Sequence, residues 1–116
     1  MASDQREPET RILYIGEAAL IYCFSFENDP TVAGGETLSA PAMTVDIARV
    51  TFGAPTVLTS DFVQYDENGL VVRTVLSGKG IRVAVTPVTR GECQATCLVN
   101  ASGGSTVARV VNFTVK

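Results

Sequence analysis

Few residues in this chain could carry out chemistry, and outside the N-terminal arm the acidic side chains form a single local group. Asp61, Asp66 and Glu67 lie close together in the sequence. Two carboxylates can act as acid and nucleophile in glycoside hydrolysis, and several carboxylate oxygens can bind Ca²⁺. The run Asp66-Glu67-Asn68-Gly69 is also typical of a hairpin, because Asn-Gly accepts the positive φ angles of a type I′ turn. Since the spacing matches no EF-hand loop, we predict a solvated turn and neither a catalytic nor a metal site.

Three further motifs have a structural explanation. Gly78-Lys79-Gly80 lacks both the four-residue gap between glycines and the following helix of a phosphate-binding loop, so we predict a tight turn. The tripeptides Asn100-Ala101-Ser102 and Asn112-Phe113-Thr114 match the glycosylation pattern. No secretory signal is recognisable, and we therefore expect both tripeptides to be chance matches.

The chain contains no histidine, which excludes histidine bases, histidine-based triads and histidine metal ligands. Only Lys79 and Lys116 remain as amine bases, and neither is an evident activator of a Ser or Thr hydroxyl. We therefore expect no catalytic, cofactor-binding or metal-binding residue, and a protein that is not an enzyme.

The three cysteines, Cys23, Cys93 and Cys97, are an odd number. Cys93 and Cys97 on one strand would lie roughly 13 Å apart, too far for a disulfide. A bond from Cys23 to either one stays possible if their strands pack together. A zinc site would have too few soft ligands, so we expect the cysteines to be small buried apolar residues.

Composition indicates one folded domain. The 116 residues are 46% hydrophobic and 18% charged, which argues against disorder. Nine Lys and Arg stand against twelve Asp and Glu, so nucleic acid is not an expected partner. No apolar stretch approaches the roughly 20 residues that span a bilayer, so we expect no membrane association.

The chain is rich in β-branched residues and predicts an all-β fold. Sixteen Val, thirteen Thr and five Ile contrast with seven Leu. Turn residues separate short apolar or alternating segments, which we expect to be strands at residues 12–15, 18–26, 43–52, 56–65, 70–76, 81–88, 93–100 and 105–116. This pattern predicts an Ig-like antiparallel β-sandwich of about seven to eight strands over residues 12–116, with residues 1–11 as an extended arm.

Alternation assigns faces to several of these strands. In 18–26, Leu20, Tyr22, Phe24 and Phe26 share one face, and the opposite face, with Cys23, is also mostly apolar, so both should be covered. In 43–52 the inward set is Met43, Val45, Ile47, Val50 and Phe52; in 81–88 it is Ile81, Val83 and Val85; in the last strand it is Val107, Val111, Phe113 and Val115.

Two segments are not needed to complete a sandwich. They are the polar arm 1–11 and the Gly- and Pro-rich loop 27–41. The arm either has no role or lies across a neighbouring subunit, where backbone hydrogen bonds would give affinity.

Several short elements carry a resemblance to a known family. They are Phe24-Ser25-Phe26, Gly35-Glu36-Thr37-Leu38-Ser39, Leu76-Ser77-Gly78, Val83-Ala84-Val85, the turn at Gly91, Cys97 in a Thr-rich strand, Ser102-Gly103-Gly104, Arg109 and Asn112-Phe113-Thr114-Val115. Together they resemble small Ig-like virion proteins of tailed bacteriophages, in particular phage fibre–tail adaptor proteins. The sequence departs from that pattern at Cys93, where an aromatic residue is common, and over residues 56–70, which are longer.

The resemblance implies a non-enzymatic virion protein that acts in many copies as an adaptor for tail fibres or neighbouring proteins. Its expected partners are other virion proteins, namely tail tube, connector or fibre, and further copies of itself in an oligomer or ring. One alternative is a capsid decoration protein that clamps the major capsid protein. Another is a carbohydrate- or surface-binding module, for which Tyr65 is the most available aromatic residue.

Overall fold

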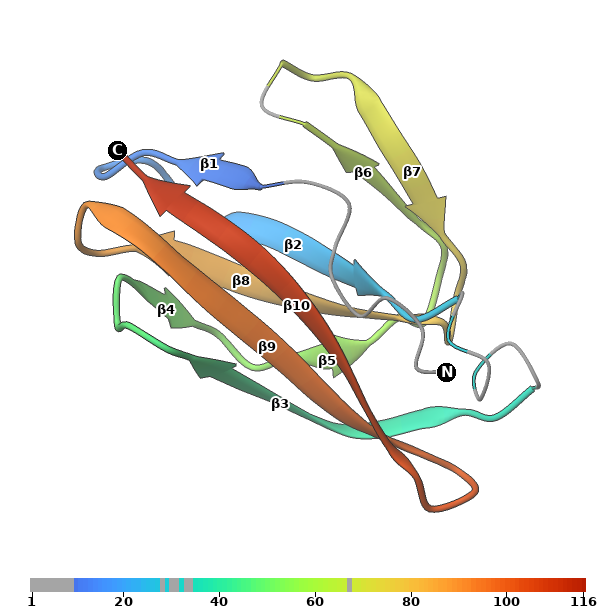
Figure 1. Ribbon diagram of the computed structural model, residues 1–116. Coiled ribbons are helices and arrows are strands. Elements are labelled where there is room, and N and C mark those ends of the chain that lie inside the picture. Colours follow the sequence, from blue (N-terminus) through green and yellow to red (C-terminus); the bar gives the residue numbers. More distant parts are fainter. Residues whose placement is uncertain (1–9, 28, 30–31, 33–34, 67) are drawn as a thin grey trace.

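The computed structural model describes residues 10–27, 29, 32, 35–66 and 68–116, and within them the regular elements are strands (Figure 1). The predicted all-β fold is confirmed. The strands are β1 (Arg11–Leu13), β2 (Leu20–Ser25), β3 (Leu38–Val45), β4 (Val50–Phe52), β5 (Thr56–Val57), β6 (Phe62–Tyr65), β7 (Val71–Val75), β8 (Gly80–Pro87), β9 (Gly91–Ala101) and β10 (Thr106–Val115).

Two sheets form the sandwich, and a separate hairpin stands beside it (Figure 1). The first sheet has the order β1-β10-β9-β3, and the second has the order β2-β8-β4, with β5 also pairing with β8. Strands β6 and β7 pair only with each other among the described residues. All pairs are antiparallel except β1 with β10, which is parallel and aligns Arg11 with Phe113.

The main core lies between the two sheets and follows the predicted alternation. Ile81, Val83 and Val85 of β8 are buried, whereas Arg82 and Thr86, on the opposite face, are exposed. The inward residues predicted for the last strand are also buried. Apolar burial on the inner faces of both sheets is what holds the sandwich together.

Strand β2 is covered on both faces at Cys23, as predicted. Tyr22, Phe24 and Phe26 belong to the main core, while Cys23 is fully buried in a second, smaller cluster. That cluster also contains Leu58, Val75 and the partly buried Phe62, so the hairpin β6–β7 supplies part of the second cover. Ile21, on the same face as Cys23, is exposed.

The prediction of one strand over residues 43–52 is wrong. The Asp46 carboxylate accepts hydrogen bonds from the backbone N–H groups of Ile47 and Gln94, both at 2.7 Å, and β3 ends at Val45. The chain then crosses to the second sheet, where β4 pairs with β8. Ile47 lies in this crossing and is exposed rather than inward. Hydrogen bonds from backbone groups to a short acidic side chain can replace the hydrogen bonds of a β-ladder and end the strand. The alternation of apolar and polar residues gives no sign of such an end.

The predicted loop also ends earlier than expected. Strand β3 begins at Leu38, inside the stretch assigned to the loop, and its ladder with β9 is irregular between Ser39 and Ala42. Ala40 has a φ of +50° there, and Pro41 has no N–H to donate. Because Pro41 is typical of a loop, the sequence predicted a loop where the irregular first part of β3 lies.

The single strand predicted over residues 56–65 is two strands with different partners. Strand β5 pairs with β8, and β6 pairs with β7. Leu58 lies between them in the small cluster, where its N–H donates to the carbonyl oxygen of Gly80. The chain thus leaves the sandwich at Leu58 and starts the hairpin.

Candidate binding groove at the edge of the sandwich

The acidic residues singled out in the sequence are held apart and bonded to backbone. Asp61 and Asp66 flank β6 at opposite ends. Asp61 accepts a 2.8 Å hydrogen bond from Ser77 N–H, and Asp66 accepts bonds of 2.9 and 3.0 Å from the N–H groups of Asn68 and Leu70. Glu67 lies outside the described residues. In the part of the chain that is described, no group of three or more acidic or cysteine side chains could hold a metal ion.

The chain turns between Asp66 and Gly69, as predicted. Gly69 has a φ of +80°, a left-handed conformation that glycine accepts without strain. The N–H of Gly69 donates to the carbonyl oxygen of Asp66, and the ladder is irregular next to it, between Gln64 and Tyr65.

The other predicted candidates serve the fold. Gly78 has a φ of +77° in a turn, and the Lys79 ammonium donates a 2.9 Å bond to the carbonyl oxygen of Val32. Asn100 and Asn112 lie within β9 and β10. The three cysteines are buried, as expected, and the disulfide left possible for Cys23 is not formed.

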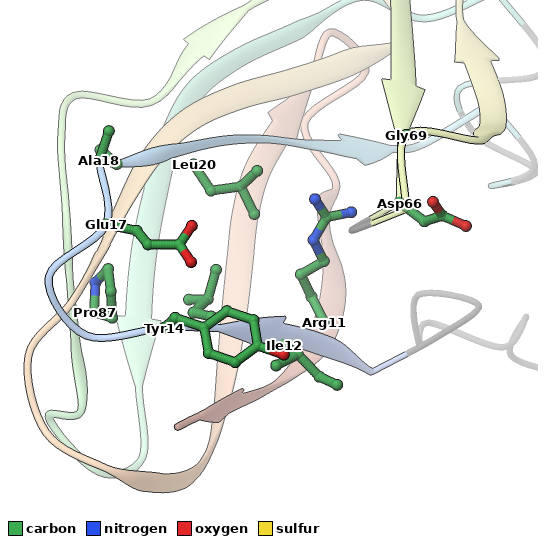
Figure 2. Close-up of a pocket in the computed structure, with 11 residues that line it drawn as sticks. Arg11, Ile12, Tyr14, Glu17, Ala18, Leu20, Asp66, Gly69 and Pro87 are labelled. Carbon is green, nitrogen blue, oxygen red and sulfur yellow. The ribbon is translucent and has the colours of Figure 1, made fainter.

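A cavity of about 410 Å³ opens where the edge of the first sheet faces the edge of the second (Figure 2). We call it the Arg11 groove. It lies between β1, the start of β2, the tip of the hairpin and the end of β8. Its lining residues are Arg11, Ile12, Leu13, Tyr14, Glu17, Ala18, Ala19, Leu20, Asp66, Gly69 and Pro87. Its volume is in the range of ligand-binding pockets.

Arg11 is the unusual residue of this groove. It was predicted to belong to the arm, but it is the first residue of β1. Its side chain lies on the same side of the strand as the core residue Leu13, and only 8% of Arg11 is exposed. A charged residue is rarely buried to this degree without a charged partner.

The guanidinium of Arg11 is only partly satisfied. Nη1 donates a 2.5 Å hydrogen bond to the backbone carbonyl oxygen of Tyr65 on β6. Nε is buried, and no hydrogen-bond acceptor is found for it among the described residues. A buried N–H without an acceptor costs about 1–3 kcal/mol, so this site lowers the stability of the unliganded chain.

Two carboxylates lie at the groove without closing an ion pair with Arg11 in the described structure. Glu17 is exposed, and Asp66 is half-buried. Figure 2 shows the Asp66 carboxylate directed away from the guanidinium. A smaller cavity of about 130 Å³ adjoins β2 and β6, and Arg11 lines it as well. Arg11 therefore lines both cavities.

The hairpin β6–β7 carries large apolar side chains in contact with water. Their exposed fractions are 42% for Val63, 51% for Tyr65, 65% for Leu70 and 61% for Val71. Tyr65 and Val71 are direct cross-strand neighbours, so they share one face of the hairpin. We call these four residues the hairpin patch.

Sequence reasoning found the exposed Tyr65 but missed the Arg11 groove. The polar run before Ile12 conceals Arg11, although Arg11 and Leu13 are two positions apart and thus face the same way. This two-residue spacing was the feature of the sequence that could have indicated an inward-facing Arg11.

Comparisons with known proteins add little. No protein-family model and no curated protein sequence matches the chain. One solved structure, the solution structure of amebosin, aligns over 94% of this chain and 90% of its own, with 13% sequence identity and a TM-score of 0.45. A likeness with so low an identity and TM-score supports no conclusion about the function of this chain. Within the described residues, no helix is long and apolar enough to cross a membrane.

Proposed function

We propose that this chain is a non-enzymatic attachment protein of a tailed-phage virion, which joins tail fibres or neighbouring proteins to the tail in several copies. The resemblance of its sequence segments to fibre–tail adaptor proteins supports the phage and tail assignment. The single structural observation that supports attachment is the hairpin patch, Val63, Tyr65, Leu70 and Val71. Its partners would be tail tube, connector or fibre proteins and further copies of the chain.

The hairpin patch favours attachment for a physical reason. Neighbouring apolar side chains in water gain free energy when a partner covers them, and such patches mark interaction surfaces. A two-stranded hairpin is only marginally stable alone. Here its base is tied to the rest of the fold, because Leu76 N–H donates to Glu27 Oε1, and its two ends are joined by a hydrogen bond from Ser77 N–H to Asp61 Oδ1. A firmly anchored hairpin presents its apolar side chains in a fixed arrangement.

The proposal is tested by assembly of the double variant Tyr65→Ser with Val71→Ser. Because both side chains are exposed, we expect unchanged stability but reduced occupancy in particles, measured by quantitative mass spectrometry of purified virions. A matched control is Ile47→Ser with Val88→Ser, which removes two apolar side chains of similar exposure elsewhere, at 48% and 50%. Equal occupancy of both double variants and the unmodified chain would contradict the role of the patch.

A cryo-EM map of the same particles locates the chain. An adaptor occupies the tail, whereas a decoration protein covers the capsid, and finding it on the capsid would replace the adaptor assignment. Glycan-array binding that is lost in Tyr65→Ala would instead support the carbohydrate-binding alternative.

A further inference from the structure

We propose that the Arg11 groove binds a carboxylate carried by an extended peptide segment of a partner protein. The inference deepens the proposed attachment function by naming the chemistry of one partner. It concerns the groove between β1, β2 and the hairpin tip, not the hairpin patch, and it is tested on the isolated chain.

The geometry of the guanidinium favours a carboxylate. Nη1 is held by the carbonyl oxygen of Tyr65, which leaves the edge formed by Nε and Nη2. The buried Nε of that edge has no acceptor in the described part of the chain. The two N–H groups of this edge point in parallel and match the two oxygens of a carboxylate. A carboxylate that enters beside Nη2 would give the buried Nε its missing acceptor after a small movement of the side chain.

The backbone around Arg11 favours a peptide in the extended form. Lys116 N–H donates to the carbonyl oxygen of Leu13, and Ile15 N–H donates to the carbonyl oxygen of Lys116. In a parallel ladder the bonds to one neighbour use alternate residues, so Ile12 directs its N–H and C=O away from β10. These groups lie at the sheet edge that borders the groove, where an added strand can bond to them.

The walls of the groove suit such a segment. Ile12, Leu13 and Leu20 supply apolar surface, and Ala18 and Ala19 have small side chains at the entrance to β2. Glu17 and Asp66 place negative charges at the same groove and would weaken the binding of any anion. A single carboxylate is therefore favoured over a multiply charged group, because the repulsion grows with the charge of the ligand.

The experiment is an NMR titration of the full-length chain that follows the Arg11 Nε–H and the Ile12 backbone N–H. The probes are blocked pentapeptides of alternating threonine and valine with a central glutamate or, as the matched control, a central glutamine. We expect the glutamate peptide to shift both signals and to bind roughly tenfold or more tightly than the glutamine peptide. The reason is that the glutamine amide cannot accept the paired, charge-assisted hydrogen bonds that the guanidinium donates to a carboxylate. A third peptide, uncharged in its side chains but with a free carboxyl terminus, separates the two sources of carboxylate. Binding by that peptide alone assigns the groove to a chain end, and binding by the glutamate peptide assigns it to an acidic side chain.

Variants keep the proposal falsifiable. Arg11→Lys retains the charge without the fork and should lose roughly tenfold in affinity. Arg11→Met should abolish binding, because it removes both nitrogens that the carboxylate would contact. Glu17→Gln should strengthen binding roughly two- to threefold by removing a like charge. Arg82→Met, at an exposed arginine of β8, is the control that should leave binding unchanged.

Three results would overturn the inference. They are equal affinity for the glutamate and glutamine peptides, peptide-induced shifts that map away from β1 and β2, and absence of binding by every peptide at millimolar concentration. Each of them leaves the attachment function open, because that function is tested by particle occupancy of the hairpin variants.

Discussion

The guanidinium of Arg73 on β7 donates a 2.8 Å hydrogen bond from Nη2 to the backbone carbonyl oxygen of Cys23 on β2. Its Nε donates a 3.1 Å bond to Oε1 of Gln64 on β6, a side chain that is only 5% exposed. One arginine therefore links both strands of the hairpin to the edge of the sandwich. Arg11, which bonds to Tyr65, makes a second link from the first sheet.

Arg73→Met should loosen the hairpin. The change leaves the Cys23 carbonyl oxygen and the buried Gln64 amide oxygen without this donor, and we expect a loss of about 2 kcal/mol in the free energy of unfolding. Urea denaturation measures the loss, and amide hydrogen exchange should accelerate selectively in β6 and β7. Arg82→Met is the matched control. Exchange that rises uniformly over the chain, or not at all, would show that Arg73 is not the tether.

Gly91→Ala should disturb the turn between β8 and β9. Gly91 has a φ of +130°, and a Cβ atom there would lie 2.5 Å from Cζ of Arg49. The guanidinium of Arg49 occupies this space and donates hydrogen bonds to the carbonyl oxygens of Arg90 and Glu92. The left-handed strain and the displaced arginine together should cost about 2–4 kcal/mol in thermal or urea unfolding.

Gly104→Ala separates these two causes. Its φ of +100° imposes backbone strain, but no described atom lies within 4 Å of the added Cβ. We therefore expect a smaller loss, about 1–2 kcal/mol, from conformation alone. Equal losses in the two variants would mean that the Arg49 contact contributes nothing.

The Cys93 thiol should make the free energy of unfolding decrease as the pH rises into the alkaline range. Burial raises its pKa above the ordinary value of 9.0, the negative charge of Asp46 raises it further, and Arg49 lowers it in part. Above about pH 9 the unfolded chain loses this proton while the folded chain still holds it. The stability from the buried neutral thiol is therefore complete below that pH and is lost as pH rises through the folded-state pKa.

The measurement is urea unfolding between about pH 8 and about pH 10 for the unmodified chain and for Cys93→Ala. Other groups titrate in the same range, so the difference between the two proteins isolates the thiol. The unmodified chain should lose stability more steeply with rising pH. Parallel curves would exclude the thiol as the cause.

Removal of residues 1–9 should leave the sandwich intact but weaken assembly. The first described strand begins at Arg11, and the removed residues are polar without an apolar period. We expect the free energy of unfolding to change by no more than about 0.5 kcal/mol. Unchanged particle occupancy would refute a role for the arm. A deletion that also takes Arg11 is a different test, because it removes part of β1.

The strands buried on one or both faces were the most predictable part of the fold. Tyr22, Phe24, Ile81 and Val83 lie in β2 and β8, where the alternation of side chains is uninterrupted. The predictions failed where the chain changes partner without changing its apolar character. Asp46 ends β3 through hydrogen bonds that depend on Gln94, which lies far away in the sequence. No local pattern encodes a contact of that kind.

The two-residue spacing of Arg11 and Leu13 indicates a shared face of the strand, but the groove itself could not be predicted, for a related reason. Arg11 becomes buried only because β1 pairs with β10 and the hairpin places Tyr65 over it. Both relationships are tertiary, and a lone arginine in a polar run gives no sign of them. Asp66 could be assigned to a turn, because its carboxylate accepts hydrogen bonds from the nearby backbone N–H groups of Asn68 and Leu70.

The parallel pairing of residues 11–13 with residues 113–115 has a consequence during synthesis on the ribosome. Strand β1 leaves the exit tunnel well before β10, the strand beside it in the sheet, and must wait for β10 before the two can pair. At typical bacterial to eukaryotic translation speeds that delay is on the order of ten seconds. Throughout this delay Leu13 lacks the strand that holds it in the core, so the nascent polypeptide exposes apolar surface that can aggregate.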